Sequence, residues 1–288
     1  MFRRLLIVAS ALAVIGAFPP SAEPADVDPS DIDFDTPAPC RWVALETREA
    51  SVTESAWLEQ NPLLRDPDNP RYVPGVNGAV ALIQMDAQQL GHLVLFDTAT
   101  GNSREILPGS PPASMPRWSP DGKLLACTVW MARNRPWVLV IVDPATGALV
   151  HPEVTGYSSQ YAWSPDGHSI VVAGTDSMGV VMHRVDTASG RSRTLFRAPY
   201  RSEFDDLCWA PDSRTIATTL VSRRDADDEH TDIWVVDMDG GACNVTFTPN
   251  IKESHPHWID GTHLVYEVKA PDGLVSRVRT LERRAVEQ

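Results

Sequence analysis

The sequence predicts an all-β protein, a β-propeller of about five four-stranded blades, and two repeated patterns are the basis of that prediction. The first is a tight turn preceded by an aromatic residue. The second is an apolar segment that ends on Asp and a Gly-containing turn, and it recurs in phase with the first. Four short strand-like segments in a period of about 40–45 residues are typical of a propeller blade. A parallel sheet is excluded, because the intervals leave no room for crossover helices.

The first pattern reads Trp-Ser-Pro-Asp-Gly in its clearest copies. Its tryptophans are 45, 46 and 49 residues apart, and a degenerate first copy lies 46 residues before the first of them. Pro fixes φ, Asp accepts hydrogen bonds from nearby N–H groups and Gly accepts a left-handed conformation, so the pattern predicts a hairpin turn. The repeat residues are Tyr72; Trp118, Asp121 and Gly122; Trp163, Asp166 and Gly167; Trp209 and Asp212; and Trp258 and Gly261. We interpret the aromatic residue as packing between neighbouring blades, in preference to a platform for carbohydrate.

The second pattern supplies the remaining strands of each unit. Its apolar segments end on an aspartate at positions 97, 143, 186 and 237. Another apolar segment follows the turn of the first pattern in each unit. These segments are Leu124–Val129, Ile170–Ala173, Thr215–Leu220 and Leu264–Val268. Together these segments predict a propeller over residues 70–282, followed by a short tail, 283–288.

The last unit lacks an outer strand, and a segment near the N-terminus is suited to supply it. Arg41–Thr47 is strand-like, and pairing it with the last blade removes an exposed sheet edge. Val52–Leu64 reads as a short amphipathic helix.

The first 22 residues predict a secretory signal. Arg3 and Arg4 precede an apolar run, Leu5–Phe18, that is too short to span a bilayer comfortably. We expect cleavage after Ala22, a spacer over residues 23–69, a periplasmic or secreted location and no stable membrane span in the mature chain. The alternative is an uncleaved N-terminal anchor.

The chain is acidic, with 25 Lys and Arg against 38 Asp and Glu and a formal net charge of -13. Such a chain repels nucleic acid and anionic lipid, so we expect neither as a partner. The four cysteines, Cys40, Cys127, Cys208 and Cys243, permit one or two disulfides in an oxidising compartment, but the sequence does not give their pairing. Cys127 and Cys208 lie in strand patterns and are equally compatible with buried thiols.

The repeated Trp-Ser-Pro-Asp-Gly turn, with the Asp-terminated strand about twenty residues later, resembles the WD40-like propeller repeat of the TolB family. The resemblance covers roughly residues 70–282 and implies a protein partner of the cell envelope. Similar blades occur in prolyl oligopeptidases and oligogalacturonate lyases. TolB carries a separate N-terminal α/β domain and six blades, whereas this chain has about 45 residues between the signal and five units. The resemblance therefore implies a TolB-like protein and not TolB itself.

No catalytic residues and no cofactor are predicted. A Gly-x-Ser-x-Gly nucleophile elbow, Gly-rich phosphate loops and Cys-x-x-Cys spacing are absent from the sequence. An acidic loop interrupts the strands of the fourth unit, and insertions at one face of a repeat array commonly form the binding surface. Its acidic residues, Asp225, Asp227, Asp228 and Glu229, are therefore the predicted partner-binding residues of a non-enzymatic interaction scaffold.

The alternative function is a propeller enzyme or binding protein that acts on a carbohydrate or peptide, resembling the metal-dependent oligogalacturonate lyases. His255 and His257 are two residues apart on a predicted strand, which places both imidazoles on one face, where they can share a metal. His257 occupies the position before the repeat tryptophan, where Arg117, Ala162 and Cys208 stand in other units. That variability favours surface histidines over a metal site.

Overall fold

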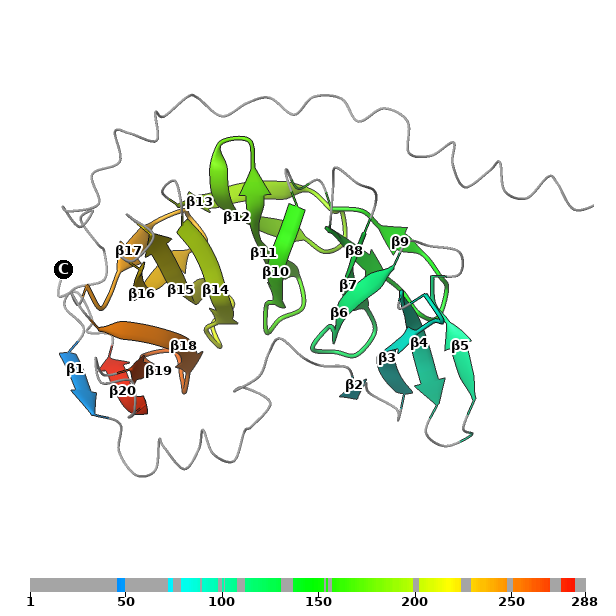
Figure 1. The fold of residues 1–288 in the computed structure, drawn as a ribbon, viewed down its shortest axis with the longest axis horizontal. Helices are drawn as coiled ribbons and strands as arrows, with labels where there is room; N and C mark the ends of the chain where they lie inside the picture. The colour runs from blue at the N-terminus through cyan, green and yellow to red at the C-terminus, as the bar shows by residue number, and fades with distance from the viewer. Residues whose placement is uncertain are drawn as a thin grey trace, which may run out of the picture. The chain divides into compact units, whose positions relative to one another are not determined.

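The computed structural model describes residues 46–49, 72–74, 79–88, 90–97, 100, 102–107, 112–130, 137–152, 154, 157–198, 202–223, 229–247, 251–269 and 276–282. All of them belong to one compact unit, Asp33–Gln288. Every regular element in these ranges is a β-strand, from β1 to β20 (Figure 1). The predicted signal, the helix predicted over Val52–Leu64 and the tail 283–288 lie outside the described residues.

The strands form five consecutive blades of four. Blade 1 contains β2 (Tyr72–Pro74), β3 (Ala79–Met85), β4 (Gly91–Asp97) and β5 (Ser103–Glu105); blade 2 contains β6 (Ala113–Trp118), β7 (Leu125–Val129), β8 (Val138–Val142) and β9 (Leu149–Val150). Blade 3 contains β10 (Tyr157–Trp163), β11 (Ser169–Asp176), β12 (Gly179–Asp186) and β13 (Ser192–Arg197); blade 4 contains β14 (Ser202–Trp209), β15 (Thr215–Arg223), β16 (Glu229–Asp237) and β17 (Ala242–Asn244). Blade 5 contains β18 (Lys252–Trp258), β19 (His263–Lys269), β20 (Ser276–Glu282) and β1 (Glu46–Glu49).

Within each blade, neighbouring strands pair antiparallel, so the predicted fold class, an all-β propeller of four-stranded blades, is confirmed. Blades 4 and 5 are additionally joined by one parallel bridge between Thr231 of β16 and Lys252 of β18.

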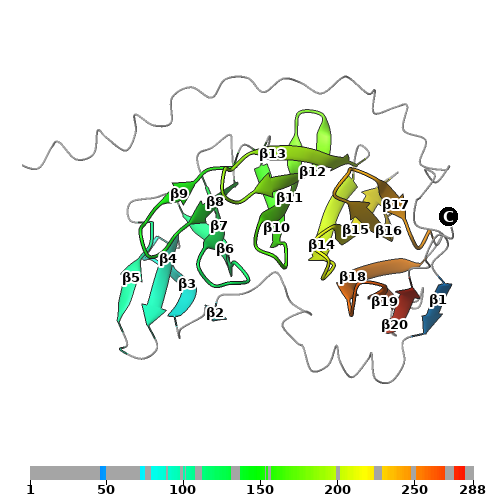
Figure 2. The ribbon, with the colours of Figure 1, turned by 180° about the vertical axis from the view of Figure 1, so that it is seen from behind.

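The strand that completes blade 5 comes from the N-terminal part of the chain, as predicted. β1 pairs antiparallel with β20, with Glu46 opposite Glu282 and Glu49 opposite Arg279. The two strands lie side by side in both views (Figure 1, Figure 2). The pairing overlaps the C-terminal end of the predicted segment and extends two residues beyond it.

The core lies in layers between consecutive blades, because the middle strands are buried on both faces. On β7, Leu125 and Cys127 pack in the cluster shared with blade 1, while Ala126 between them packs against blade 3. On β8, Val140 and Ile141 divide in the same way. This strict alternation follows from the two-residue period of a strand.

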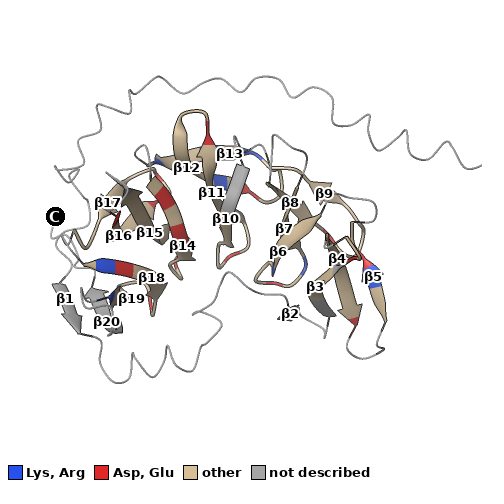
Figure 3. Ribbon diagram, in the orientation of Figure 1, with Lys and Arg blue, Asp and Glu red and all other residues tan. Residues whose placement is uncertain are grey.

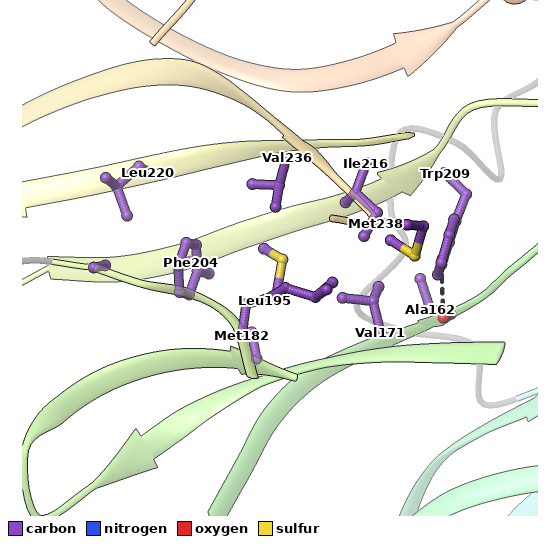
Figure 4. Close-up of a cluster of buried hydrophobic side chains, with 12 residues drawn as sticks. Ala162, Val171, Met182, Leu195, Phe204, Trp209, Ile216, Leu220, Val236 and Met238 are labelled. Atoms are coloured by element: carbon purple, nitrogen blue, oxygen red, sulfur yellow. Dashed lines mark hydrogen bonds between the residues drawn. The ribbon is translucent and has the colours of Figure 1, made fainter. Parts of the chain in front are cut away.

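The layer between blades 3 and 4 contains the repeat tryptophan of blade 4. Trp209 packs with Val171, Met182, Phe204 and Ile216, and its indole points back toward Ala162 of blade 3 (Figure 4). The repeat aromatic therefore belongs to the packing between blades.

Candidate functional site

The blades present two kinds of edge, which we call the turn face and the loop face. The turn face carries the short turns between the first and second strands of each blade and, in blades 1 to 4, those between the third and fourth strands. The loop face carries the connections between the second and third strands and those between blades. On the turn face, a hydrogen bond joins blades 3 and 4, where Asp166 N–H donates to Ser213 Oγ at 3.1 Å. On the loop face, Lys252 of blade 5 pairs with Glu229 of blade 4 at 2.8 Å. Contacts between neighbouring blades are therefore made on both faces.

The repeat aspartates of the turn face hold their own turns. Ser119 Oγ donates to Asp121 at 2.7 Å, Ser164 Oγ donates to Asp166 at 2.6 Å, and Asp212 accepts the N–H of Arg214 at 2.8 Å. The hydroxyl of Ser119 lowers the pKa of Asp121. Burial would raise the pKa of Asp260, but hydrogen bonds from Thr262 and His263 lower it to about 2. These carboxylates therefore accept hydrogen bonds from groups of their own turns.

Two of the repeat glycines adopt a left-handed backbone conformation in their turns, and Gly261 does not. Gly122 has φ 69° and Gly167 has φ 73°, the left-handed region that glycine enters without steric cost. Ser213 holds the same position in blade 4 with φ 56°. Gly261 has open space where a Cβ would stand.

Two repeat tryptophans bond the preceding blade at equivalent places. Trp163 Nε1–H donates to Arg117 O at 3.1 Å, and Trp209 Nε1–H donates to Ala162 O at 3.0 Å. Each acceptor is the residue immediately before the tryptophan of the previous blade. Trp118 is half-buried against the core shared by blades 1 and 2, and Tyr72 lies on β2 with a side chain outside the described part. The indole nitrogen of Trp258 is buried and has no hydrogen-bond partner among the described residues.

The loop face collects exposed apolar side chains. Leu90, Trp130, Met178 and Phe247 are 40, 44, 46 and 54 % exposed, and each lies in a connection that ends at this face. Trp130 and Trp137 flank the connection between β7 and β8, with ring centroids 6.1 Å apart. Leu149, also 44 % exposed, lies instead on the outer strand β9. The sequence analysis did not identify these exposed residues. The available signal was that Trp130 and Trp137 lie outside the repeated strand pattern, on either side of a loop.

The predicted partner-binding residues Asp225, Asp227 and Asp228 lie outside the described residues, in the connection between β15 and β16. Glu229 begins β16 and pairs with Lys252 of blade 5 at 2.8 Å. Glu229 thus links two blades at the edge where the acidic loop ends.

The structure separates the two candidate histidine ligands. The register of β18 against β19 shifts between Ser254 and His257, and His255 has φ 54°, so the expected two-residue alternation is interrupted. The expectation that both imidazoles point to one face therefore failed because of a β-bulge. No group of three or more metal-ligating side chains is present in the described ranges.

His255 lies between two carboxylates. Its Nε2 is 3.8 Å from Oδ1 of Asp206, and its Nδ1 is 3.5 Å from Oε2 of Glu267. Its backbone N–H also donates to Asp206 at 3.0 Å. Burial raises the pKa of Asp206, whose side chain is 5 % exposed. β14, which carries Asp206, shows the acidic residues as red bands in Figure 3.

His257 lies beside Cys208, which is a free thiol. Its Nδ1 is 3.9 Å from the Cys208 sulfur. Burial raises the pKa of Cys208 to about 11 and that of Cys127, the other free thiol, to about 12. Burial therefore disfavours the thiolate, which is the reactive form, at both positions. Cys243 is disulfide-bonded, and Cys40 lies outside the described residues.

Protonation of His183 should make the folded protein less stable at acidic pH. Its side chain on β12 is buried, and burial lowers its pKa below 6.5. The unfolded chain therefore binds a proton more readily than the folded chain. Stability is retained above pH 6.5 and is lost as the pH falls toward the depressed folded pKa.

We expect H183Q to reduce the loss of Tm between pH 7 and pH 5 relative to the parent. H168Q, an exposed histidine on the turn face, is the control, and equal losses in H183Q and the parent would contradict the prediction.

None of the described residues forms a helix that is long and apolar enough to cross a membrane.

Comparisons with known proteins bear on the fold. No protein-family model matches the sequence. The chain is 29 % identical over 115 residues to the uncharacterised peptidase YuxL of Bacillus subtilis (strain 168); the match covers 38 % of this chain and 17 % of that protein. It therefore spans a minor part of this relative's length.

Two solved structures cover most of the chain. One is a presumed TolB of Agrobacterium tumefaciens, with a TM-score of 0.52, 20 % identity, and coverage of 73 % of this chain and 76 % of that one. The other is the β-propeller domain of the Trilobed protease from Pyrococcus furiosus, with a TM-score of 0.54, 18 % identity, and coverage of 72 % and 66 %. At these identities the likeness shows the fold, and the fold of this chain is a β-propeller.

Proposed function

We propose that this protein is an exported, non-enzymatic interaction scaffold of the cell envelope, and that its loop face binds another protein. The observation that carries the proposal is the gathering of exposed apolar side chains on that face. Four of the five large hydrophobic residues exposed among the described residues lie there. Exposed apolar side chains on one face of a folded domain can serve as anchors for a partner, and Trp, Phe and Met are enriched at interfaces.

The turn face is poorly suited to the same role. Its aspartates are engaged by their own turns, with hydrogen bonds such as that from Thr146 Oγ1 to Asp143 at 2.7 Å. A partner that contacted them would have to compete with these bonds. The loop face, by contrast, offers Trp130 beside Trp137, a pair of large rings that can be buried at little cost in side-chain entropy.

The acidic loop sets the charge expected of the partner. Asp225, Asp227 and Asp228 stand in the sequence between β15 and β16, and the whole chain carries a net charge of -13. A partner with basic residues around an apolar centre complements both features, since complementary charge speeds and orients association. The proposal includes an export signal, which is expected from the first 22 residues. It also includes an envelope partner, which the TolB resemblance implies.

The test is capture of envelope proteins by the purified mature chain and by two matched variants. We expect W130A to lose any specifically captured protein, since a buried tryptophan anchor typically contributes about 2 kcal/mol or more at an interface. L149A removes a side chain of the same exposure, 44 %, from the outer strand β9 and should retain it. Circular dichroism checks that both variants are folded. Equal capture by W130A and L149A would contradict the proposed face.

The rival function, a metal-dependent enzyme acting on a carbohydrate or peptide, makes a different prediction in the same experiment. Hydrolysis or elimination of a substrate that survives W130A but stops on H255Q would favour the rival over the scaffold.

A further inference from the structure

We propose that the seam between blades 4 and 5 holds a soft monovalent metal ion, Cu(I) or its analogue Ag(I), between the sulfur of Cys208 and Nδ1 of His257. This inference does not depend on the proposed function. It starts from the contact between the two side chains, 3.9 Å from sulfur to nitrogen.

The repeat itself brings these two residues together. Cys208 precedes Trp209 and His257 precedes Trp258, so they occupy equivalent positions of consecutive blades. The corresponding residues of the earlier blades are Arg117 and Ala162. Hydrogen bonds from Trp163 to Arg117 O and from Trp209 to Ala162 O show that this position faces the next blade. Of these seams, only that between blades 4 and 5 carries a ligating side chain on both sides.

The separation suits one ion bound to both atoms. Metal bonds of about 2.3 Å to sulfur and about 2.0 Å to nitrogen place these atoms roughly 3.5 Å apart at a tetrahedral angle and roughly 4.3 Å apart when linear. The observed 3.9 Å lies between these limits. An ion can therefore enter with small side-chain movements.

The number of ligands selects the kind of ion. The described residues contain no group of three or more metal-ligating side chains, whereas Zn²⁺ takes four ligands and Ca²⁺ or Mg²⁺ takes six or more. Thiolate and imidazole are soft and borderline donors that favour Cu(I), which readily accepts two ligands. Binding forms a metal–sulfur bond as the thiol S–H bond breaks. The proton leaves to solvent, and no electron is transferred.

An ion bound between Cys208 and His257 should stabilise the contact between blades 4 and 5. At this seam the indole N–H of Trp258 lacks a partner within the described part of the chain, unlike the indoles of Trp163 and Trp209. An ion between Cys208 on β14 and His257 on β18 would connect the two inner strands. Since it binds the folded form, it should raise the Tm.

The experiment is anaerobic competition for Cu(I) between the full mature chain and the indicator bicinchoninate, with Ag(I) as a second probe in thermal melts. We expect one Cu(I) per chain and a Tm increase with one equivalent of Ag(I). Both C208S and H257Q should weaken Cu(I) binding by more than about 100-fold, since changes to residues that only orient a metal ligand already cost about 10–100-fold. They should also abolish the Ag(I) shift.

The controls separate this pair from the other thiol and the other histidine. C127A removes the second free thiol, and H255Q removes the imidazole beside Asp206; both should bind Cu(I) as the parent does. Melting without metal checks that each variant is folded. Failure of the parent to take Cu(I) from the indicator, or loss of binding in C127A or H255Q but not in C208S, would overturn the proposal.

Discussion

Replacing Trp209 by Ala is expected to lower the free energy of unfolding by about 3–5 kcal/mol, as truncation of large buried aromatic residues does. Its side chain is 7 % exposed and fills the layer between blades 3 and 4. It packs with residues of both blades, so the cavity would open at the seam. Urea unfolding followed by circular dichroism measures the change.

W209F divides that effect into packing and hydrogen bonding. Phe keeps an aromatic ring but cannot donate to Ala162 O, which the indole reaches at 3.0 Å. A buried acceptor left unsatisfied costs about 1–3 kcal/mol. W130A, at an exposed tryptophan, should change stability by less than about 0.5 kcal/mol. If W209F were as stable as the parent, the hydrogen bond between blades would contribute nothing to stability.

Removing the disulfide of Cys243 is the second large expected effect. This residue lies on β17, the outer strand of blade 4, and is disulfide-bonded, while Cys127 and Cys208 are free thiols. We expect its partner to be Cys40, because the other two cysteines of the chain are free thiols. We expect C243S to lower the free energy of unfolding by about 2–5 kcal/mol, the usual cost of losing a native disulfide.

Two measurements check the disulfide. Peptide mapping of the unreduced protein should find the Cys243 peptide joined to the Cys40 peptide, with Cys127 and Cys208 recoverable as thiols after unfolding. Dithiothreitol should lower the Tm of the parent to that of C243S and leave C243S unchanged. A Cys243 peptide recovered as a free thiol, or equal Tm values for the parent and C243S, would contradict the prediction.

The sequence was sufficient to predict the blades because their determinants are local. Pro, Asp and Gly define the turns within a few residues, and the apolar strands follow each turn at short range. The strand that completes blade 5 could also be predicted, since the last unit lacked one and a strand-like segment stood upstream. Its bounds were less accurate, because Glu46–Glu49 is defined by pairing with a distant strand, β20.

The candidate sites depended on features that no local pattern signals. Asp206 and His255 adopt positive φ, 54° in both cases, at bulges of the inner strands, and the alternating apolar pattern does not mark where a bulge falls. One extra residue in the strand was enough to direct His255 toward Asp206 and His257 toward Cys208. The loop-face side chains were missed for another reason: Met178 and Phe247 look like ordinary apolar residues until their exposure is known.

The pairing of β1 with β20 places a condition on how the protein reaches its native state. Glu46 is paired with Glu282, so blade 5 is built from segments that are far apart in the sequence. Blades 1 to 4 are built from contiguous sequence and can form as the chain emerges, but blade 5 has to wait until β20 has been synthesised. Contacts of such high sequence separation slow folding, and the exposed edge of β20 is open to intermolecular pairing until β1 pairs with it. The step most vulnerable to aggregation should therefore be the pairing of β1 with β20.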